Sequence, residues 1–200
     1  MSNEPLRIGV TMRVVQAAGY LEPRDALAQN WSNFLSAALP EMVWLPLPNL
    51  GKRNIRKFCV RWGINRLILT GGEDIGDAPI RDETEIELLN WAMTSGVPAL
   101  GICRGMQLMA VSAGGTLKAI QNHVHAYHSL SGDFSHRVNS FHSLGLVHCP
   151  FGFKIAATAE DGEIEAISDP GRRWNGWMWH PERETPFNPV DIQNLRTLFA

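Results

Sequence analysis

The chain has 200 residues, of which 44% are hydrophobic and 19% are charged, so it can build the full core of one α/β domain. Its formal net charge of −2 gives no electrostatic basis for binding nucleic acid or an anionic membrane surface. No apolar stretch approaches the ~20 residues that span a bilayer, and the start of the chain lacks the pattern of a signal peptide. Three scattered cysteines predict no disulfide framework, so we expect a cytoplasmic protein.

The first half of the chain alternates predicted strands and helices. Apolar runs predict strands at residues 6–12, 42–45, 66–70 and 97–102, and helical spacing predicts helices at residues 24–39, 54–62, 82–94 and 104–113. Pro46 and Pro48 are expected to break the second strand. This alternation is typical of a doubly wound, mostly parallel sheet with helices on both faces.

The second half has a different character. Residues 120–136 are polar and rich in His and Ser, which predicts an irregular surface excursion. Short strands, some of them antiparallel, are predicted at residues 137–141, 154–158, 164–168 and 176–179, and a helix at residues 191–199 closes the chain. No repeat or clear linker is present, so we expect a single domain over residues 1–200.

A candidate nucleophile lies where a predicted buried strand meets a helix. Gly101-Ile102-Cys103-Arg104-Gly105 has the G-x-C-x-G spacing of a nucleophile elbow, in which flanking glycines allow a sharp turn. A helix that begins at Arg104 favours the thiolate form of Cys103 through its dipole. The alternative, a cysteine that only fills the core, fits Cys59 and Cys149 better, because neither has this context.

A cysteine nucleophile needs a histidine base and a group that orients the ring. His180 follows the apolar segment 177–179 at the expected active edge of the sheet. If Pro181 keeps the backbone extended, His180 and Glu182 project to the same side. The alternative is a solvated histidine beside a surface glutamate.

The other histidines indicate no site of their own. His123, His125 and His128 lack the carboxylate or cysteine spacing of a zinc site and are expected to be solvated loop residues, so no metal is predicted. His142 is expected to border the pocket. The Gly71-Gly72 pair after a strand could supply a second set of backbone amides, although any tight turn could use it.

Three motifs, LTGGEDI, GICRGMQ and WHPERE, resemble the class I glutamine amidotransferase superfamily in their order and separation. Within it, the chain is most similar to the γ-glutamyl hydrolase branch (peptidase C26 type). The resemblance implies a flavodoxin-like fold with Cys103 as nucleophile, His180 as acid and base, and Glu182 as orienting group. It also implies an oxyanion hole from the amides of Gly72 and Arg104, and no cofactor.

The same resemblance implies where a γ-glutamyl substrate binds. Gln107 and the segment 141–144, with Phe141, Ser143 and Leu144, match positions that hold the glutamyl group. A closer resemblance is to hydrolases of nucleotide-linked γ-glutamyl amidates in bacterial capsule modification. It is carried by the segments TMRVVQAAGYLEPRDALAQNW, NSFHS and MWHPERE.

Phosphates on such a substrate would need cations. The candidates are Arg13, Arg24 and Arg104, whose alternative role is ordinary surface charge. For Arg13, which follows the first strand, the two interpretations are equally supported.

The motifs leave three interpretations open. The first is a free-standing hydrolase of a small-molecule γ-glutamyl amide, and the second is a glutaminase subunit that passes ammonia to a synthase partner. The third, a catalytically silent binding module, ranks last because neither the cysteine nor the histidine is lost. The sequence also leaves open whether the chain forms a homo-oligomer.

Overall fold

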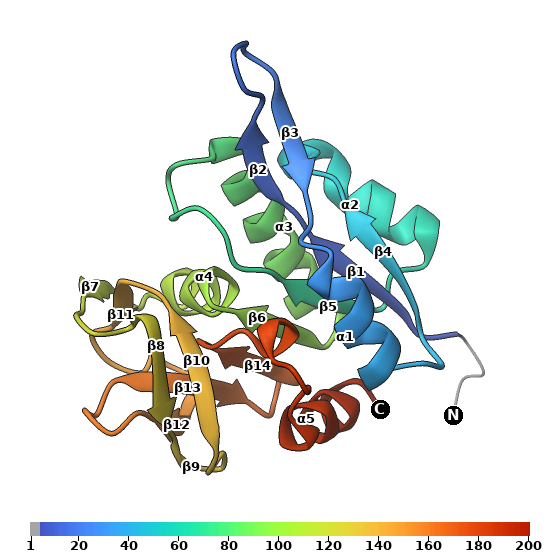
Figure 1. Ribbon diagram of the computed structural model, residues 1–200. Coiled ribbons are helices and arrows are strands. Elements are labelled where there is room, and N and C mark those ends of the chain that lie inside the picture. Colours follow the sequence, from blue (N-terminus) through green and yellow to red (C-terminus); the bar gives the residue numbers. More distant parts are fainter. Residues whose placement is uncertain (1–4) are drawn as a thin grey trace.

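The computed structural model describes residues 5–200 (Figure 1). Residues 1–4, which form part of the segment examined for a signal peptide, lie outside the described residues. The helices are α1 (Asn30–Ala38), α2 (Gly51–Trp62), α3 (Pro79–Ser95), α4 (Arg104–Ser112) and α5 (Pro189–Phe199), with a 3-10 turn η1 (Pro181–Arg183). No helix in this part of the chain combines the length and apolar character needed to cross a membrane.

One sheet of eight strands crosses the molecule. In spatial order its strands are β4 (Val43–Leu47), β1 (Arg7–Thr11), β5 (Arg66–Leu69), β6 (Ala99–Ile102), β14 (Trp174–Trp177), β13 (Ile164–Asp169), β12 (Lys154–Thr158) and β9 (Ser131–Gly132). The strands from β4 to β14 pair in parallel, whereas β13, β12 and β9 are antiparallel. Renumbered along the chain, the parallel strands have the order 2-1-3-4-5, which confirms the flavodoxin-like arrangement.

Helices cover both faces of this sheet. On one face α1 and α5 pack their apolar sides against β1, β5 and β14, with Phe34 and Phe199 fully buried. On the other face α2, α3 and α4 bury Ile55, Leu88 and Leu108 against the same sheet. Each such side chain contributes roughly 1.5–3 kcal/mol by leaving water, so the sheet is fixed from both sides.

Three small antiparallel pairs surround the main sheet. They are β2 (Arg13–Gln16) with β3 (Pro23–Ala26), β7 (Leu117–Ala119) with β11 (Leu144–Leu146), and β8 (Val124–Ser129) with β10 (Arg137–Phe141). The β2–β3 hairpin projects away from the main sheet, while β8 and β10 lie beside β12 and β13 (Figure 1). None of β2, β3, β7 and β11 was predicted.

Several predicted boundaries in the first half are wrong, and α2 and α3 begin earlier than predicted, at Gly51 and Pro79. The helix expected at residues 24–39 begins only at Asn30, because residues 23–26 pair with β2. Asp25 accepts hydrogen bonds from the backbone and side chain of Asn49, and these long-range contacts hold the segment extended. Pro46 does not break its strand, since β4 is an edge strand and a proline there removes no bond on its open side.

The second half also differs from expectation. Residues 120–136 are not an irregular excursion, because they contain β8 and β9. The strand expected at residues 176–179 is β14, which ends at Trp177. Met178 and Trp179 follow β14 without belonging to it, and both are completely buried in the core.

Candidate active site

The turn at Cys103 is a strained connection between β6 and α4. Cys103 has φ 51° and ψ −107°, a conformation that costs a residue with a side chain about 1–3 kcal/mol. A Cβ added to Gly101 would lie 2.5 Å from the carbonyl carbon of Gly105, and one added to Gly105 would lie 2.2 Å from the carbonyl oxygen of Leu69. The turn therefore depends on both glycines of the G-x-C-x-G motif.

Backbone contacts fix where the Cys103 sulfur lies. The Cys103 amide donates to the carbonyl of Trp177 on β14 at 2.7 Å, and its carbonyl accepts from the Gln107 amide at 3.0 Å, which begins the α4 ladder. The side chain is 8% exposed, at the N-terminus of that helix. A helix N-terminus stabilises negative charge, so this position suits a thiolate.

His180 and Glu182 meet in the buried segment that follows β14. His180 Nδ1 lies 2.7 Å from Glu182 Oε1, and both residues are 3% exposed. The expected extended backbone is wrong, because Pro181–Arg183 form a 3-10 turn. The two side chains nevertheless point together, since the turn also places Glu182 beside the ring.

Asn139 of β10 holds the backbone of His180, a role that the sequence analysis missed. Its Oδ1 accepts from the His180 amide at 3.0 Å, and its Nδ2 donates to the His180 carbonyl at 2.8 Å. The predicted strand at residues 137–141 also contains Arg137 and Ser140, so its pattern did not single out Asn139. Asn139 is itself buried, so this clamp is not loosened by water.

The charge state of His180 follows from its neighbours. Burial of the ring opposes protonation, but the charge of Glu182 and the side chain of Cys103 outweigh it and raise the pKa of His180 to about 9. At neutral pH the ring is therefore an imidazolium. A cation beside Cys103 stabilises the thiolate and can later donate its proton to a leaving group.

The loop after β5 lies against both of these side chains. A Cβ added to Gly71 would lie 2.6 Å from His180 Cε1 and 3.5 Å from Cys103 Cβ. Gly72 has φ 150°, and a Cβ there would lie 2.4 Å from a guanidinium nitrogen of Arg81. The ends of the adjacent strands β5, β6 and β14 thus bring the loop, the thiol and the imidazole to one edge of the sheet.

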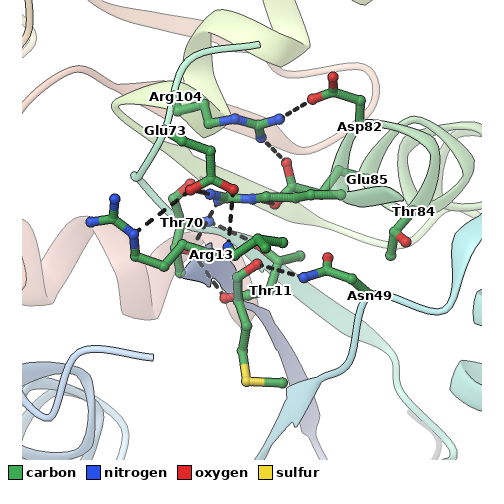
Figure 2. A network of polar contacts seen from close by, with 12 residues as sticks. Thr11, Arg13, Asn49, Thr70, Glu73, Asp82, Thr84, Glu85 and Arg104 are labelled. Atoms are coloured by element: carbon green, nitrogen blue, oxygen red, sulfur yellow. Dashed lines mark hydrogen bonds and ion pairs between the residues drawn. The ribbon is translucent and has the colours of Figure 1, made fainter. Parts of the chain in front are cut away.

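A buried polar network ties the loop to the body of the protein (Figure 2). Arg81 of α3 donates to the carbonyls of Thr70 at 2.7 Å and Gly71 at 3.1 Å, and it pairs with Glu73 at 2.9 Å and Glu85 at 3.0 Å. Arg81 and Glu85 are completely buried. Their i, i+4 spacing was visible in the sequence, but their burial was not.

Arg104 is a second buried cation of this network, and its position corrects one prediction. Its guanidinium is 1% exposed and pairs with Asp82 and Glu85, as Figure 2 shows. Arg104 is thus unavailable to bind a substrate phosphate. Its backbone amide, at the first position of α4, remains the candidate oxyanion donor.

Some of the other residues predicted to contact the substrate lie close to one another or to His180. Gln107 Nε2 donates to the Leu144 carbonyl at 3.1 Å, and the ring of Phe141 lies 6.0 Å from that of His180 in an edge-to-face arrangement. Ser143 is exposed, and its carbonyl accepts from the amide of Ile120.

Two arginines border the site. Arg13 lines a pocket with Gly72 and His180, and its half-exposed side chain lies 3.7 Å from Glu73. Arg183, which the sequence analysis did not single out, lines the same pocket and stacks over Phe141 at 4.6 Å. Arg24 pairs instead with Glu22 on the exposed β2–β3 hairpin, away from this pocket lining.

The prediction of solvated loop histidines is wrong for His123. Its ring is completely buried against Glu165 and Asp161, because the segment around it joins the β8–β10 pair rather than a loop. His125 is exposed as expected, and His128 is half-buried. His142 is buried against Glu165 as well.

Comparison with known proteins identifies the family of this chain and agrees with its fold. The profile of the family "Glutamine amidotransferase class-I" matches residues 49–194, and the chain belongs to that family. A glutamine amidotransferase from Thermotoga maritima has a similar structure, with a TM-score of 0.67 and 14% identity, covering 98% of this chain and 84% of its own.

Among curated sequences, the chain is 27% identical over 191 residues to the gamma-glutamyl-CDP-amidate hydrolase of Campylobacter jejuni subsp. jejuni serotype O:2, covering 92% of this chain and 94% of the relative. It is also 35% identical over 149 residues to one of the subunits of the glutamine-hydrolysing GMP synthase of Natronomonas pharaonis, covering 67% of this chain and 75% of the relative. The family and these relatives support amide hydrolysis.

Proposed function

We propose that this chain is a free-standing, single-domain γ-glutamyl amide hydrolase of the peptidase C26 type, with Cys103, His180 and Glu182 as its catalytic residues. The observation that carries the proposal is the meeting of three neighbouring strand ends. There a strained cysteine at a helix N-terminus, a carboxylate-bound imidazolium and a glycine loop share one small volume. That combination provides a nucleophile, a proton donor and backbone amides for an oxyanion.

The reaction proceeds by acyl transfer. The Cys103 thiolate attacks the γ-carbonyl carbon, and the amides of Gly72 and Arg104 stabilise the tetrahedral oxyanion, each contributing roughly 3 kcal/mol. The His180 imidazolium gives its proton to the departing nitrogen as the C–N bond breaks, leaving a γ-glutamyl thioester. His180, now neutral, deprotonates a water that attacks the thioester and releases glutamate and the thiolate.

The glutamyl end binds on the side of α4 and β10, with contacts from Gln107 and the segment 141–144. The bond from Gln107 to the Leu144 carbonyl and the position of Phe141 beside His180 support this placement. The side chain of Ser143 is exposed, so it is the backbone of this segment that is offered to the substrate.

For the leaving group we propose a nucleotide-linked amidate of capsule polysaccharide modification. The similarity to the Campylobacter jejuni hydrolase covers nearly the whole of both chains, which supports this class of substrate. Arg13 borders the pocket on the Gly72 side with about half of its side chain exposed, so it can meet a phosphate.

Glutamate release measured with three substrates tests the proposal: glutamine, a γ-glutamyl amine and a γ-glutamyl phosphoramidate of a nucleoside diphosphate. We expect the last to have the highest kcat/KM and Cys103→Ala to be inactive. Turnover by Cys103→Ala would refute the mechanism, and activity on glutamine alone would refute the substrate. Arg13→Gln should raise KM for the nucleotide substrate and leave glutamine unaffected, with Arg24→Gln on the hairpin as the matched control.

The similarity to the Natronomonas pharaonis protein favours one second candidate, a glutaminase that supplies ammonia to a synthase. The catalytic residues would be identical. Glutamine hydrolysis that is negligible for the isolated chain and strong with a co-purified synthase would favour this candidate, whereas turnover of the nucleotide substrate by the isolated chain would exclude it.

A further inference from the structure

A second cluster of ionisable side chains lies outside the candidate active site. His123, His142 and Glu165 are all buried, and one donor atom from each lies within 4.8 Å of the others. Glu165 Oε1 is 3.1 Å from His123 Nδ1 and 3.3 Å from His142 Nε2. These residues come from the segment before β8, the turn after β10, and β13, so the cluster joins three parts of the fold.

The atoms of the cluster that face one another have no hydrogen-bond partner among residues 5–200. His123 Nδ1, His142 Nε2 and both oxygens of Glu165 are buried without one, although the atoms are close together. The distances are short enough for hydrogen bonds, so it is the direction of the ring nitrogens that prevents them. Buried polar groups without partners are costly, and their concentration at one point calls for a ligand between them.

Contacts on the outer side of each ring decide which nitrogen carries a lone pair. His123 Nε2 lies 2.9 Å from Asp161 Oδ2, and His142 Nδ1 lies 3.1 Å from the carbonyl of Leu144. Both outer partners are oxygen acceptors, so the outer nitrogens carry the hydrogens and, in neutral rings, His123 Nδ1 and His142 Nε2 carry lone pairs. A carboxylate or carbonyl on the far nitrogen is the arrangement that orients metal-binding histidines.

From this geometry we propose that His123, His142 and Glu165 bind a divalent cation of the zinc class. In tetrahedral sites with bonds of about 2.0–2.1 Å, neighbouring donor atoms stand about 3.3 Å apart, close to the two distances measured here. Two imidazoles and one carboxylate suit zinc better than calcium or magnesium. Three protein donors leave a fourth position, for water or for the buried Nε2 of His128, which has no partner among the described residues. The His128 ring lies 4.0 Å from that of His123 between centroids, tilted by 32°.

The site would stabilise the segment proposed to hold the glutamyl group. His142 lies within residues 141–144, and the Leu144 carbonyl that orients its ring also accepts from Gln107 of α4. The cation thereby fixes this segment against β13. Its proposed role is structural, because His123, His142 and Glu165 are not among the residues that line the pocket beside Gly72 and His180.

The competing interpretation is an ion-pair cluster without metal. Contacts with Glu165 and Asp161 raise the pKa of His123, so an imidazolium could balance the buried carboxylate. Such a cluster would require N–H groups directed at Glu165, and the unpartnered ring nitrogens do not meet that requirement. A chelator should lower the Tm of a metal-bound protein and leave the Tm of a metal-free ion-pair cluster unchanged.

The test uses full-length protein carrying Cys103→Ser, which removes the candidate active-site thiol as a rival zinc ligand. After dialysis against a chelator, zinc should bind at about one ion per chain and raise the Tm, and cobalt should give the visible absorption of a tetrahedral site. Glu165→Gln and His142→Asn should lose this binding. His148→Asn, which changes an exposed histidine outside the cluster, should keep it.

Because the cluster variants could unfold, the unsubstituted chain gives an independent measurement. Its Tm should fall after chelation and recover when zinc is restored. A Tm that is indifferent to chelator and zinc, or zinc uptake by Cys103→Ser no greater than that of a folded Glu165→Gln, Cys103→Ser double variant, would overturn the proposal and favour the ion-pair cluster.

Discussion

Substitution of Gly71 by alanine is a direct test of the packing between the loop after β5 and the candidate catalytic side chains. The new Cβ would lie 2.6 Å from His180 Cε1, about 0.8 Å short of the 3.4 Å at which ordinary contact begins. The backbone of Gly71 is not in the left-handed region, so alanine adds volume without adding backbone strain. The added methyl group therefore clashes with the imidazole ring of His180.

The imidazole has little freedom to move. Glu182 holds its Nδ1 at 2.7 Å, and Asn139 holds its backbone on both sides. Relief of the contact requires a shift of about 0.8 Å in the ring or the loop, and a misplacement of about 1 Å typically lowers a rate about 10²-fold. Overpacking should also destabilise the protein by about 1–3 kcal/mol.

The assay is kcat/KM for glutamate release from the preferred substrate, with circular dichroism and urea unfolding to verify the fold. Gly171→Ala is the matched control, since its Cβ would meet only one side-chain oxygen, at 3.3 Å. We expect Gly71→Ala to lose about 10²-fold in kcat/KM while remaining folded, and Gly171→Ala to retain its activity. A folded Gly71→Ala enzyme with unchanged kcat/KM would refute the proposed contact between the loop and the imidazole.

Three further outcomes follow from the buried charges and thiols. Because the pKa of His180 is raised to about 9, its stabilising contribution of up to about 3 kcal/mol should be complete below pH ~6.5 and disappear as pH rises through 9, as measured by urea unfolding. Removing the shared carboxylate with Glu85→Gln leaves two buried guanidiniums undercompensated and should lower the unfolding free energy by about 3–5 kcal/mol. Iodoacetamide at neutral pH should modify Cys103 in the folded protein but not Cys59, whose pKa burial raises to about 12, as peptide mass spectrometry can show.

Each of these outcomes has its own control. The pH dependence should flatten in Glu182→Gln, and a slope unchanged by that substitution would contradict its assignment to the His180 pair. Glu83→Gln, an exposed change on the same helix as Glu85, should shift stability by less than about 0.5 kcal/mol. Equal labelling of Cys59 and Cys103 in folded protein would contradict the difference between their environments.

The parallel half of the fold was predictable because its signals are local. Residues 67–69 and 99–102 are short runs without a polar side chain, and β5 and β6 form there with only small differences at their ends. The β2–β3 hairpin escaped prediction, since Pro23–Ala26 is extended through contacts with Asn49 and β2 rather than through its own pattern. Local propensity could not indicate those partners.

The sequence by itself determined the residues with chemistry to offer: a cysteine between two glycines, a His-Pro-Glu segment, and a glycine pair after a strand. Only the tertiary structure decided how they meet. It placed Gly71 against both Cys103 and His180 and fixed His180 through Asn139, because contacts between adjacent strand ends depend on the order of the sheet.

Burial was likewise decided by the tertiary structure. Arginine and histidine are polar residue types that usually lie at the surface, yet Arg81 and His123 are both completely buried. Arg81 pairs with Glu73 on the loop after β5, and His123 pairs with Asp161 and Glu165 from a distant part of the chain. These groups supply the interactions that water would otherwise provide. A single sequence does not show such partners, because they become neighbours only when the sheet has formed.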